Sequence, residues 1–163
     1  MSGKVTPAVT ALTEAGVEHR LHEYEPDTGG EVGYGMDAAL KLSLDPGQVF
    51  KTLVIELDKD PNHLGVVVAP ATGEIDLRAA AGALGAKKGA MADVTRVERV
   101  TGYVHGGISP FGQRKALPTV LDETSILYET IFVSGGRRGL EIEIAPDDLV
   151  AVLDAAVADV ARG

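Results

Sequence analysis

The feature that most constrains the fold is a pair of apolar, β-prone segments joined by a short polar turn. Residues 49–57 are rich in Val, Ile, Leu and Phe, and residues 64–69 form a second apolar run after the turn at 58–62. Branched and aromatic residues favour strands, and two such runs separated by a short turn favour antiparallel pairing. The sequence therefore predicts a β-hairpin.

Short helices are predicted wherever a capping residue and a glycine bracket an apolar pattern. Thr6 and Pro7 precede such a pattern that stops at Gly16, while Asp76 and Asp93 can cap helices over 77–84 and 94–101. Another helix is expected at 36–42, and a final one begins at Pro146. In that last helix one apolar stripe would be formed by Leu149, Val150, Leu153, Val157 and Val160. Further strands are expected at 17–25, 103–105, 119–121, 130–133 and 140–144.

The length and the order of these elements indicate a single domain. A chain of 163 residues with 45% apolar residues is long enough to bury one core. Several strands alternate with short helices, and there is no internal repeat and no long linker. We therefore expect residues 1–163 to form one α/β (α+β) domain around a mixed, curved sheet.

Several classes of function are disfavoured by composition. The chain has no cysteine, so it can form neither a disulfide nor a thiolate metal site. Its four histidines are not spaced as a helical zinc pair, and no Gly-Gly pair continues into a phosphate-binding P-loop. We expect no metal and no cofactor. The first ten residues lack the apolar core of a signal peptide, and no apolar run could cross a bilayer, so a soluble cytoplasmic protein with no membrane partner is expected.

The charge is unevenly distributed along the chain. The net charge is −9, yet residues 78–138 hold nine basic and five acidic side chains, a net +4. This segment could contact a phosphate backbone, or its charges could form a solvated face. Seven Phe and Tyr residues and no Trp do not suffice for an aromatic RNA-stacking platform, and DNA is not an expected partner. Eight of these nine basic residues are Lys87, Lys88, Arg96, Arg99, Arg114, Lys115, Arg137 and Arg138.

Two glycine-rich loops, at 106–113 and 134–139, predict a binding site. Each follows a short β-branched or aromatic run, so each is expected to leave the end of a strand with open backbone amides. Glycine lets a ligand approach the backbone closely. Ser109 and Ser134 lie in these loops outside any Gly-x-Ser-x-Gly elbow and without a recognisable base. We therefore expect them to position a ligand rather than act as nucleophiles.

Lys51 stands out within the first strand of the hairpin. Alternation places it on one face with apolar neighbours such as Leu53 and Ile55, while Phe50 and Thr52 occupy the other face. A lysine in such surroundings either reaches to an edge of the sheet or is held there to bind an anionic or carbonyl group.

Eight segments, in order over nearly the whole chain, resemble the YbaK/EbsC family of Cys-tRNA(Pro) deacylases. They are TPAV (6–9), HEYE (22–25), VFKTL (49–53), LGAKK (84–88), TGY (101–103), GGISPFGQ (106–113), LPT (117–119) and VSGGRRGL (133–140). The resemblance implies a single α/β domain with a partly barrel-like sheet, related to the editing domain of prolyl-tRNA synthetase. It also implies hydrolysis of cysteine wrongly attached to tRNA(Pro), with Cys-tRNA(Cys) as a further substrate and prolyl-tRNA synthetase as a partner.

The resemblance also assigns roles to residues. The substrate's own thiol would attack the ester, Lys51 would lie near the terminal adenosine and the ester, and the amides of Gly106 or Gly107 would meet the developing oxyanion. Substrate-binding positions would be Tyr24, Tyr34, Ser109, Ser134, Gly135 and Glu141, and the tRNA backbone would meet Lys87, Lys88, Arg137 and Arg138.

Two positions depart from the family pattern. Tyr34 replaces a phenylalanine and Glu141 replaces an aspartate, and in a small pocket such changes can alter selectivity by about 1–3 kcal/mol. Two alternatives remain: a deacylase for another small amino acid such as alanine, and a noncatalytic module that binds tRNA or a synthetase.

Overall fold

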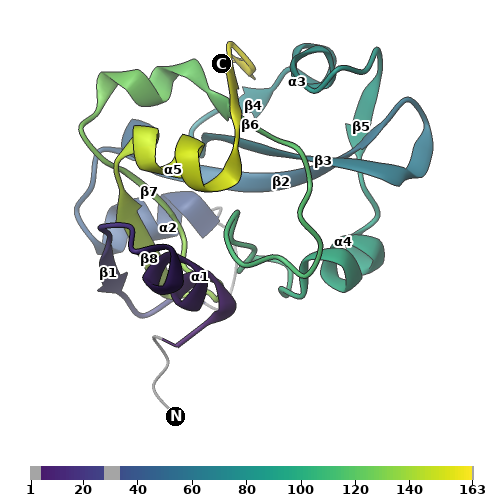
Figure 1. The fold of residues 1–163 in the computed structure, drawn as a ribbon. Coiled ribbons are helices and arrows are strands. Elements are labelled where there is room, and N and C mark those ends of the chain that lie inside the picture. The colour runs from purple at the N-terminus through teal and green to yellow at the C-terminus, as the bar shows by residue number, and fades with distance from the viewer. Residues whose placement is uncertain (1–4, 28–33, 163) are drawn as a thin grey trace.

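The computed structural model describes residues 5–27 and 34–162 as an α/β domain (Figure 1). The helices are α1 (Pro7–Ala15), α2 (Tyr34–Lys41), α3 (Leu77–Ala83), α4 (Val94–Thr101) and α5 (Pro146–Leu153), with 3-10 turns η1 (Pro46–Gln48) and η2 (Glu123–Leu127). The strands are β1 (Arg20–Glu23), β2 (Phe50–Leu57), β3 (Asp60–Pro70), β4 (Glu74–Ile75), β5 (Gly89–Met91), β6 (Thr119–Asp122), β7 (Ile131–Ser134), β8 (Leu140–Ile144), β9 (Ala156–Ala158) and β10 (Ala161–Arg162).

The strands form three sheets in this part of the chain. The five-stranded sheet has the order β5-β2-β3-β6-β9, with the predicted β2–β3 hairpin at its centre and parallel pairing from β3 to β6 and β9. A three-stranded sheet has the order β1-β8-β7, and β4 pairs with β10. A bridge between Val49 and Phe132 joins the two larger sheets, but the described strands do not close into a barrel.

The core lies on both faces of the five-stranded sheet. Between the two larger sheets Phe50, Val54 and Leu121 pack against Ile131 and Ile142. On the opposite face the alanine-rich α3 covers a second cluster that includes Ile55 and Val67. Figure 1 shows α3 on one side of this sheet and α1 with the three-stranded sheet on the other. No helix in the described residues is long and apolar enough to cross a membrane.

The local capping signals predicted the helix ends well. The Thr6 hydroxyl accepts the Val9 amide at the start of α1, and Gly16 ends that helix with a φ of 70°. Asp93 caps α4 in the same way, and Gly102 ends it in the left-handed region. These helices therefore form where the sequence predicted them.

The strand predicted at 103–105 is wrong. The segment is irregular and connects α4 to the first glycine-rich loop, because Tyr103 turns into the core and its hydroxyl donates to the Phe111 carbonyl. The first glycine-rich loop thus follows a helix and a turn, whereas the second follows strand β7 as predicted.

The predicted final helix is correct only as far as Leu153. Asp154 adopts a left-handed conformation and ends α5, and the chain continues as β9 beside β6. The buried Asp122 carboxylate accepts the amides of Val160 and Ala161, both at 2.9 Å, and so fixes this extended tail. The helical spacing of Val157 and Val160 was therefore a coincidence, since Val157 is exposed in β9 and Val160 is buried between β9 and β10.

Candidate active site

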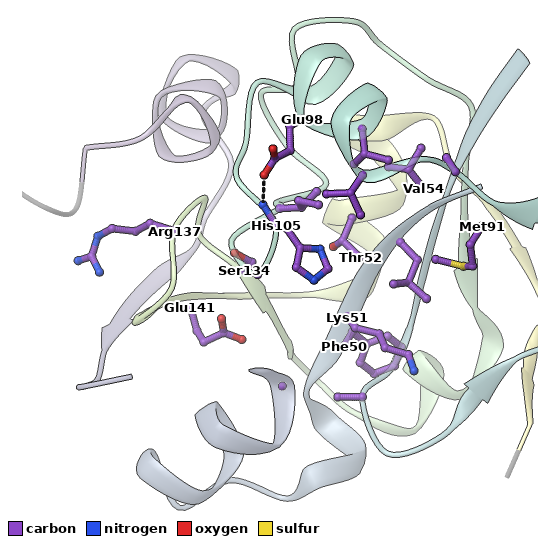
Figure 2. Close-up of a pocket in the computed structure, with 18 of the residues that line it drawn as sticks. Phe50, Lys51, Thr52, Val54, Met91, Glu98, His105, Ser134, Arg137 and Glu141 are labelled. Carbon is purple, nitrogen blue, oxygen red and sulfur yellow. Dashed lines mark hydrogen bonds between the residues drawn. The ribbon is translucent and has the colours of Figure 1, made fainter. Parts of the chain in front are cut away.

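A cavity of about 310 Å³ lies beside β2 (Figure 2). Its lining comes from β2, the start of α2, the segment from β5 into α4, both glycine-rich loops and the start of β8. Most of the wall is apolar and includes Phe50, Leu53, Met91, Val94 and Ile108. A small apolar cavity with a few polar groups is the usual form of a small-molecule site.

The cavity exists because β2 has an uncovered edge. β5 pairs with β2 only from Ile55 to Leu57, and the bridge to Phe132 involves Val49. Between these points no described strand pairs with this edge of β2, and residues 50–54 line the cavity instead. The site therefore occupies a gap in the sheet between β5 and β7.

Lys51 lies in this gap and is half-buried. Its amine donates to the carbonyl of Gly73, next to β4. Burial lowers the pKa of the Lys51 ammonium from its usual range, while the Glu74 carboxylate opposes that shift. The bond to Gly73 thus fixes the Lys51 amine, and the residue lines the cavity without an ion pair to any described carboxylate.

The two glycine-rich loops touch each other beside the cavity. A Cβ on Gly107 would lie 2.8 Å from the Cα of Arg137, so only glycine permits this approach. The Gly107 amide donates to the Val104 carbonyl at 2.9 Å and is therefore already used. The Gly106 amide bonds no group in the described residues, and Gly106, with a φ of 92°, lines the cavity. Of the two predicted oxyanion donors, Gly106 lines the cavity and Gly107 does not.

Ser134, Glu141 and Tyr24 form the polar end of the cavity. Ser134 and Glu141 are direct partners in the β7–β8 ladder, and the Ser134 hydroxyl accepts the Gly136 amide at 3.2 Å. Tyr24 follows β1, and its amide donates to the Gly139 carbonyl, which fixes it beside the second loop. All three residues line the cavity.

Glu141 is a buried carboxyl group inside the cavity. It is 6% exposed, and no group in the described residues hydrogen-bonds its carboxyl. Figure 2 shows that carboxyl directed into the cavity. Burial raises the pKa of Glu141 to about 8, so the group is mostly neutral at pH 7. Burial, and then the proximity of Glu141, also raise the pKa of Tyr24.

Other predicted site residues lie outside the cavity. Ser109 is fully buried, and its hydroxyl accepts the Phe111 amide at 3.3 Å, so it stabilises the first loop from within. Gly135 lies against Leu140 and does not line the cavity. Tyr34 begins α2, but its side chain lies outside the described part of the structure.

The predicted tRNA-contacting residues divide into two groups. Arg137 borders the cavity, but Figure 2 shows its side chain directed away, and its guanidinium bonds Glu23 at 2.9 Å. The Arg138 guanidinium donates to the Asp27 carbonyl. Lys87 and Lys88 are exposed at the start of β5, and their amides donate to Asp58. There they line a second, shallower hollow together with Lys59 and Arg78.

Three polar residues of the cavity were not singled out from the sequence: His105, Glu98 and Thr52. The His105 amide donates to the Glu98 carboxylate at 2.7 Å, across the turn that follows α4. The Thr52 hydroxyl is buried without a hydrogen-bond partner in the described residues. The position of His105 directly before the Gly-Gly pair was the one available signal, and the mistaken strand at 103–105 concealed it.

Comparison with known proteins gives concordant matches. A family model described as "Aminoacyl-tRNA editing domain" matches residues 35–152. A protein of Enterococcus faecalis, assigned as the Cys-tRNA(Pro)/Cys-tRNA(Cys) deacylase EbsC, is 40% identical over 164 aligned residues, which cover 98% of each chain.

Solved structures with the same fold cover nearly all of the chain. One, assigned as a trans-editing enzyme for prolyl tRNA synthetase, has a TM-score of 0.83 at 25% identity, with 100% of this chain and 99% of that one covered. The hypothetical protein APE2540 has a TM-score of 0.83 at 23% identity, with 96% and 100% covered, and shows the fold alone. The α/β fold of this chain is thus a recurrent architecture.

Proposed function

Because the chain belongs to the family of aminoacyl-tRNA editing domains, within its YbaK/EbsC branch, we propose that it is a trans-editing deacylase. It hydrolyses the ester of Cys-tRNA(Pro), and Cys-tRNA(Cys) is a second substrate. The observation that carries this proposal is the small cavity in which Lys51, Gly106, Ser134 and Glu141 line one space. Proline and cysteine are similar in size, so a synthetase pocket shaped for proline needs a second site to remove cysteine.

The chemistry relies on the substrate's thiol. The sulfur attacks the ester carbonyl, a carbon–sulfur bond forms, and the ribose oxygen leaves with a proton. Water then opens the resulting thiolactone and releases cysteine. The Gly106 amide donates to the oxyanion that develops during the attack. This route needs no nucleophile from the protein.

The remaining polar groups bind the aminoacyl end. The Lys51 ammonium contacts the terminal adenosine near the ester, and the Ser134 hydroxyl holds the aminoacyl group. Glu141 faces the α-amino group, whose positive charge draws the carboxyl toward its ionised form. Tyr24 closes this end of the cavity, and Tyr34 is a further proposed contact of the substrate.

The tRNA backbone continues from the cavity toward the second hollow. Met91, at one end of β5, lines the cavity, and Gly89, at the other end, lines the hollow. Three extended residues span about 10 Å, which a few nucleotides of a single-stranded 3′ end can bridge. Lys87 and Lys88, with Lys59 and Arg78, supply positive charge there. Arg137 and Arg138 are proposed as weaker contacts because their guanidinium groups already bond Glu23 and Asp27.

Prolyl-tRNA synthetase is the proposed partner, and the cytoplasm the proposed location. With a net charge of −9, the protein should bind free tRNA weakly and with strong salt dependence. A synthetase that holds the tRNA body would raise the effective concentration of the 3′ end. Adding synthetase should therefore raise deacylation at limiting enzyme. Tight, salt-independent binding of tRNA by the isolated protein would contradict this expectation.

The deciding experiment compares substrates and one variant. Purified protein is incubated with labelled Cys-, Ala- and Pro-tRNA(Pro) and with Cys-tRNA(Cys), and the loss of aminoacyl label is measured. We expect cleavage of both cysteinyl substrates and little cleavage of the others. Lys51→Ala should lose most activity while its thermal unfolding stays cooperative. Preference for Ala-tRNA(Pro) would identify the alternative deacylase, and no cleavage of any substrate would favour a binding module.

The role of the thiol is tested separately. Ser-tRNA(Pro) carries a hydroxyl in place of the thiol, and an S-methylated cysteinyl substrate has the sulfur blocked. Both should be cleaved far more slowly than Cys-tRNA(Pro). Equal rates on Ser- and Cys-tRNA(Pro) would exclude assistance by the thiol.

A further inference from the structure

His105 is the imidazole that borders the cavity. The chain has four histidines, and His105 is the one found among the described residues that line the cavity. Figure 2 shows its ring directed into the cavity between Ser134 and Thr52. The hydrogen bond from its amide to Glu98 ties this point of the loop to α4. The ring therefore stands on a fixed backbone, directly before the Gly106 amide.

The proposed reaction has to remove a proton from the thiol, and most groups that face the cavity cannot accept it at neutral pH. Tyr24 is a phenol whose pKa is raised by burial, and Lys51 is a cationic group. Glu141 has a pKa raised to about 8 in the free protein, and in the proposed complex its carboxyl is engaged by the α-amino group of the substrate. Glu98 is a carboxylate, but one of its oxygens accepts the His105 amide. Imidazole is the side chain best suited to take up and release a proton near pH 7.

We propose that the imidazole of His105 is the general base of the reaction. This inference rests on the proposed thiol-assisted deacylation. The ring nitrogen takes the thiol proton as the sulfur bonds to the ester carbon. The imidazolium then gives that proton to the ribose oxygen as the carbon–oxygen bond breaks. Atoms and charge balance within the substrate and His105, and water enters only when the thiolactone opens.

The surroundings of His105 suit this role. The Glu98 carboxylate accepts the His105 amide and so holds the backbone of this residue in place beside the cavity. The Gly106 amide, one residue along, is the proposed donor to the oxyanion. One short segment thus supplies both the base and the electrostatic stabilisation, and their relative position is fixed by the chain itself.

The test compares His105→Gln with a matched control, His19→Gln. His19 lies before β1, where its ring bonds the Val17 carbonyl, and it does not line the cavity. Single-turnover deacylation of Cys-tRNA(Pro) is measured from pH 6 to pH 9 for both variants and the unchanged protein. We expect His105→Gln to lose about 100-fold in rate at pH 7 with little change in KM, because general bases contribute on this scale. The loss should shrink toward pH 9 as the thiol ionises without help, and His19→Gln should match the unchanged protein.

Chemical rescue provides a second readout. Added imidazole should restore part of the activity of His105→Ala and should have no effect on Lys51→Ala. A loss that is equal at every pH and resists imidazole would show that His105 only shapes the cavity and would overturn the inference, as would full activity of both His105 variants. If the unchanged protein itself fails to cleave Cys-tRNA(Pro), the proposed function fails instead.

Discussion

The two glycine-rich loops have similar composition but serve different parts of the molecule. The loop at 106–113 places its serine in the core, where Ser109 is fully buried and bonded to Phe111. The loop at 134–139 begins with Ser134, which lines the cavity. A serine in a glycine-rich turn is therefore not by itself evidence of a site residue, because burial of the loop decides what the hydroxyl can reach.

Both loops are held by the N-terminus of α1. The Thr6 hydroxyl, which caps the helix, also donates to the Gly135 carbonyl of the second loop. Gly112 of the first loop has a φ of 66°, and a Cβ there would lie 2.4 Å from the Pro7 carbonyl oxygen. Thr6 and Pro7 thus begin α1 and also position both loops. A substitution that affects the loops without disturbing α1 therefore has to be made where the two loops contact each other.

The largest effect is expected at that contact. In Gly107→Ala the added Cβ would meet the Arg137 backbone, which cannot move aside as a side chain could. Overpacking of this kind should destabilise the protein by about 3 kcal/mol and abolish most deacylation. The control is Gly82→Ala in α3, where nothing lies within 4 Å of the added Cβ, and which should stabilise the helix by about 1 kcal/mol. Denaturant unfolding and deacylation rates measure both, and a Gly107→Ala protein as active as the control would show that the loop contact is dispensable.

A titration probes the second loop, because it adjoins the buried carboxyl of Glu141. The pKa of Glu141 is about 8 in the folded protein and near its ordinary value of 4.5 when unfolded. Between these values the folded state holds a proton that the unfolded state has lost, so stability falls as pH rises. Glu141→Gln lacks this penalty and should melt a few degrees higher at pH 8 but not at pH 4.5. Melting temperatures of both proteins are measured from pH 4.5 to pH 8. A difference in melting temperature that stays constant with pH would contradict the raised pKa of Glu141.

Substitutions of the two loop serines should affect different properties, activity at Ser134 and stability at Ser109. Ser134→Ala should lower deacylation about tenfold, since one hydrogen bond to the substrate is worth about 1.4 kcal/mol, with a small change in stability. Ser109→Ala should do the reverse, losing about 1 kcal/mol of stability while the folded protein keeps its activity. Rates and unfolding free energies of both variants are compared at one pH. Interchanged phenotypes would mean that the first loop carries the site.

The smallest effect is expected at Thr52, which contrasts with the bonded Ser109. Its buried hydroxyl lacks a partner in the described residues, so Thr52→Val should raise stability by about 1 kcal/mol or less. A melting temperature 1–2 °C higher is the expected readout. A lower value would indicate that the hydroxyl finds a partner in solution.

Local signals predicted much of the fold, and nonlocal pairing accounts for what they missed. The residues that bracket α1 and α4 act within one turn of their helices, so sequence alone located both ends. The tail from 156 onward forms strands only because β6 and Asp122 lie beside it. Nothing within that segment distinguishes it from a continued helix.

The site residues also divide into one that the local sequence singled out and others whose places depend on nonlocal packing. Lys51 could be singled out because a lysine among apolar residues of a strand is unusual, and the structure places it at the cavity. Ser109 and Ser134 could not be told apart, because the packing of Gly112 against α1 is what buries the first loop. His105 was missed because a strand was predicted at 103–105, where the structure has an irregular segment that brings this residue to the cavity.

The uncovered edge of β2 has a consequence for the protein's behaviour at high concentration. Bare strand edges invite other chains to add a strand, which is a common route to aggregation. Here the edge lies between β5 and β7 and lines a cavity of about 310 Å³, which is too small to hold an added strand. The proposed binding gap therefore also keeps the free backbone groups of β2 from pairing with a strand of another chain. A variant that widened the gap would be expected to lose solubility along with selectivity.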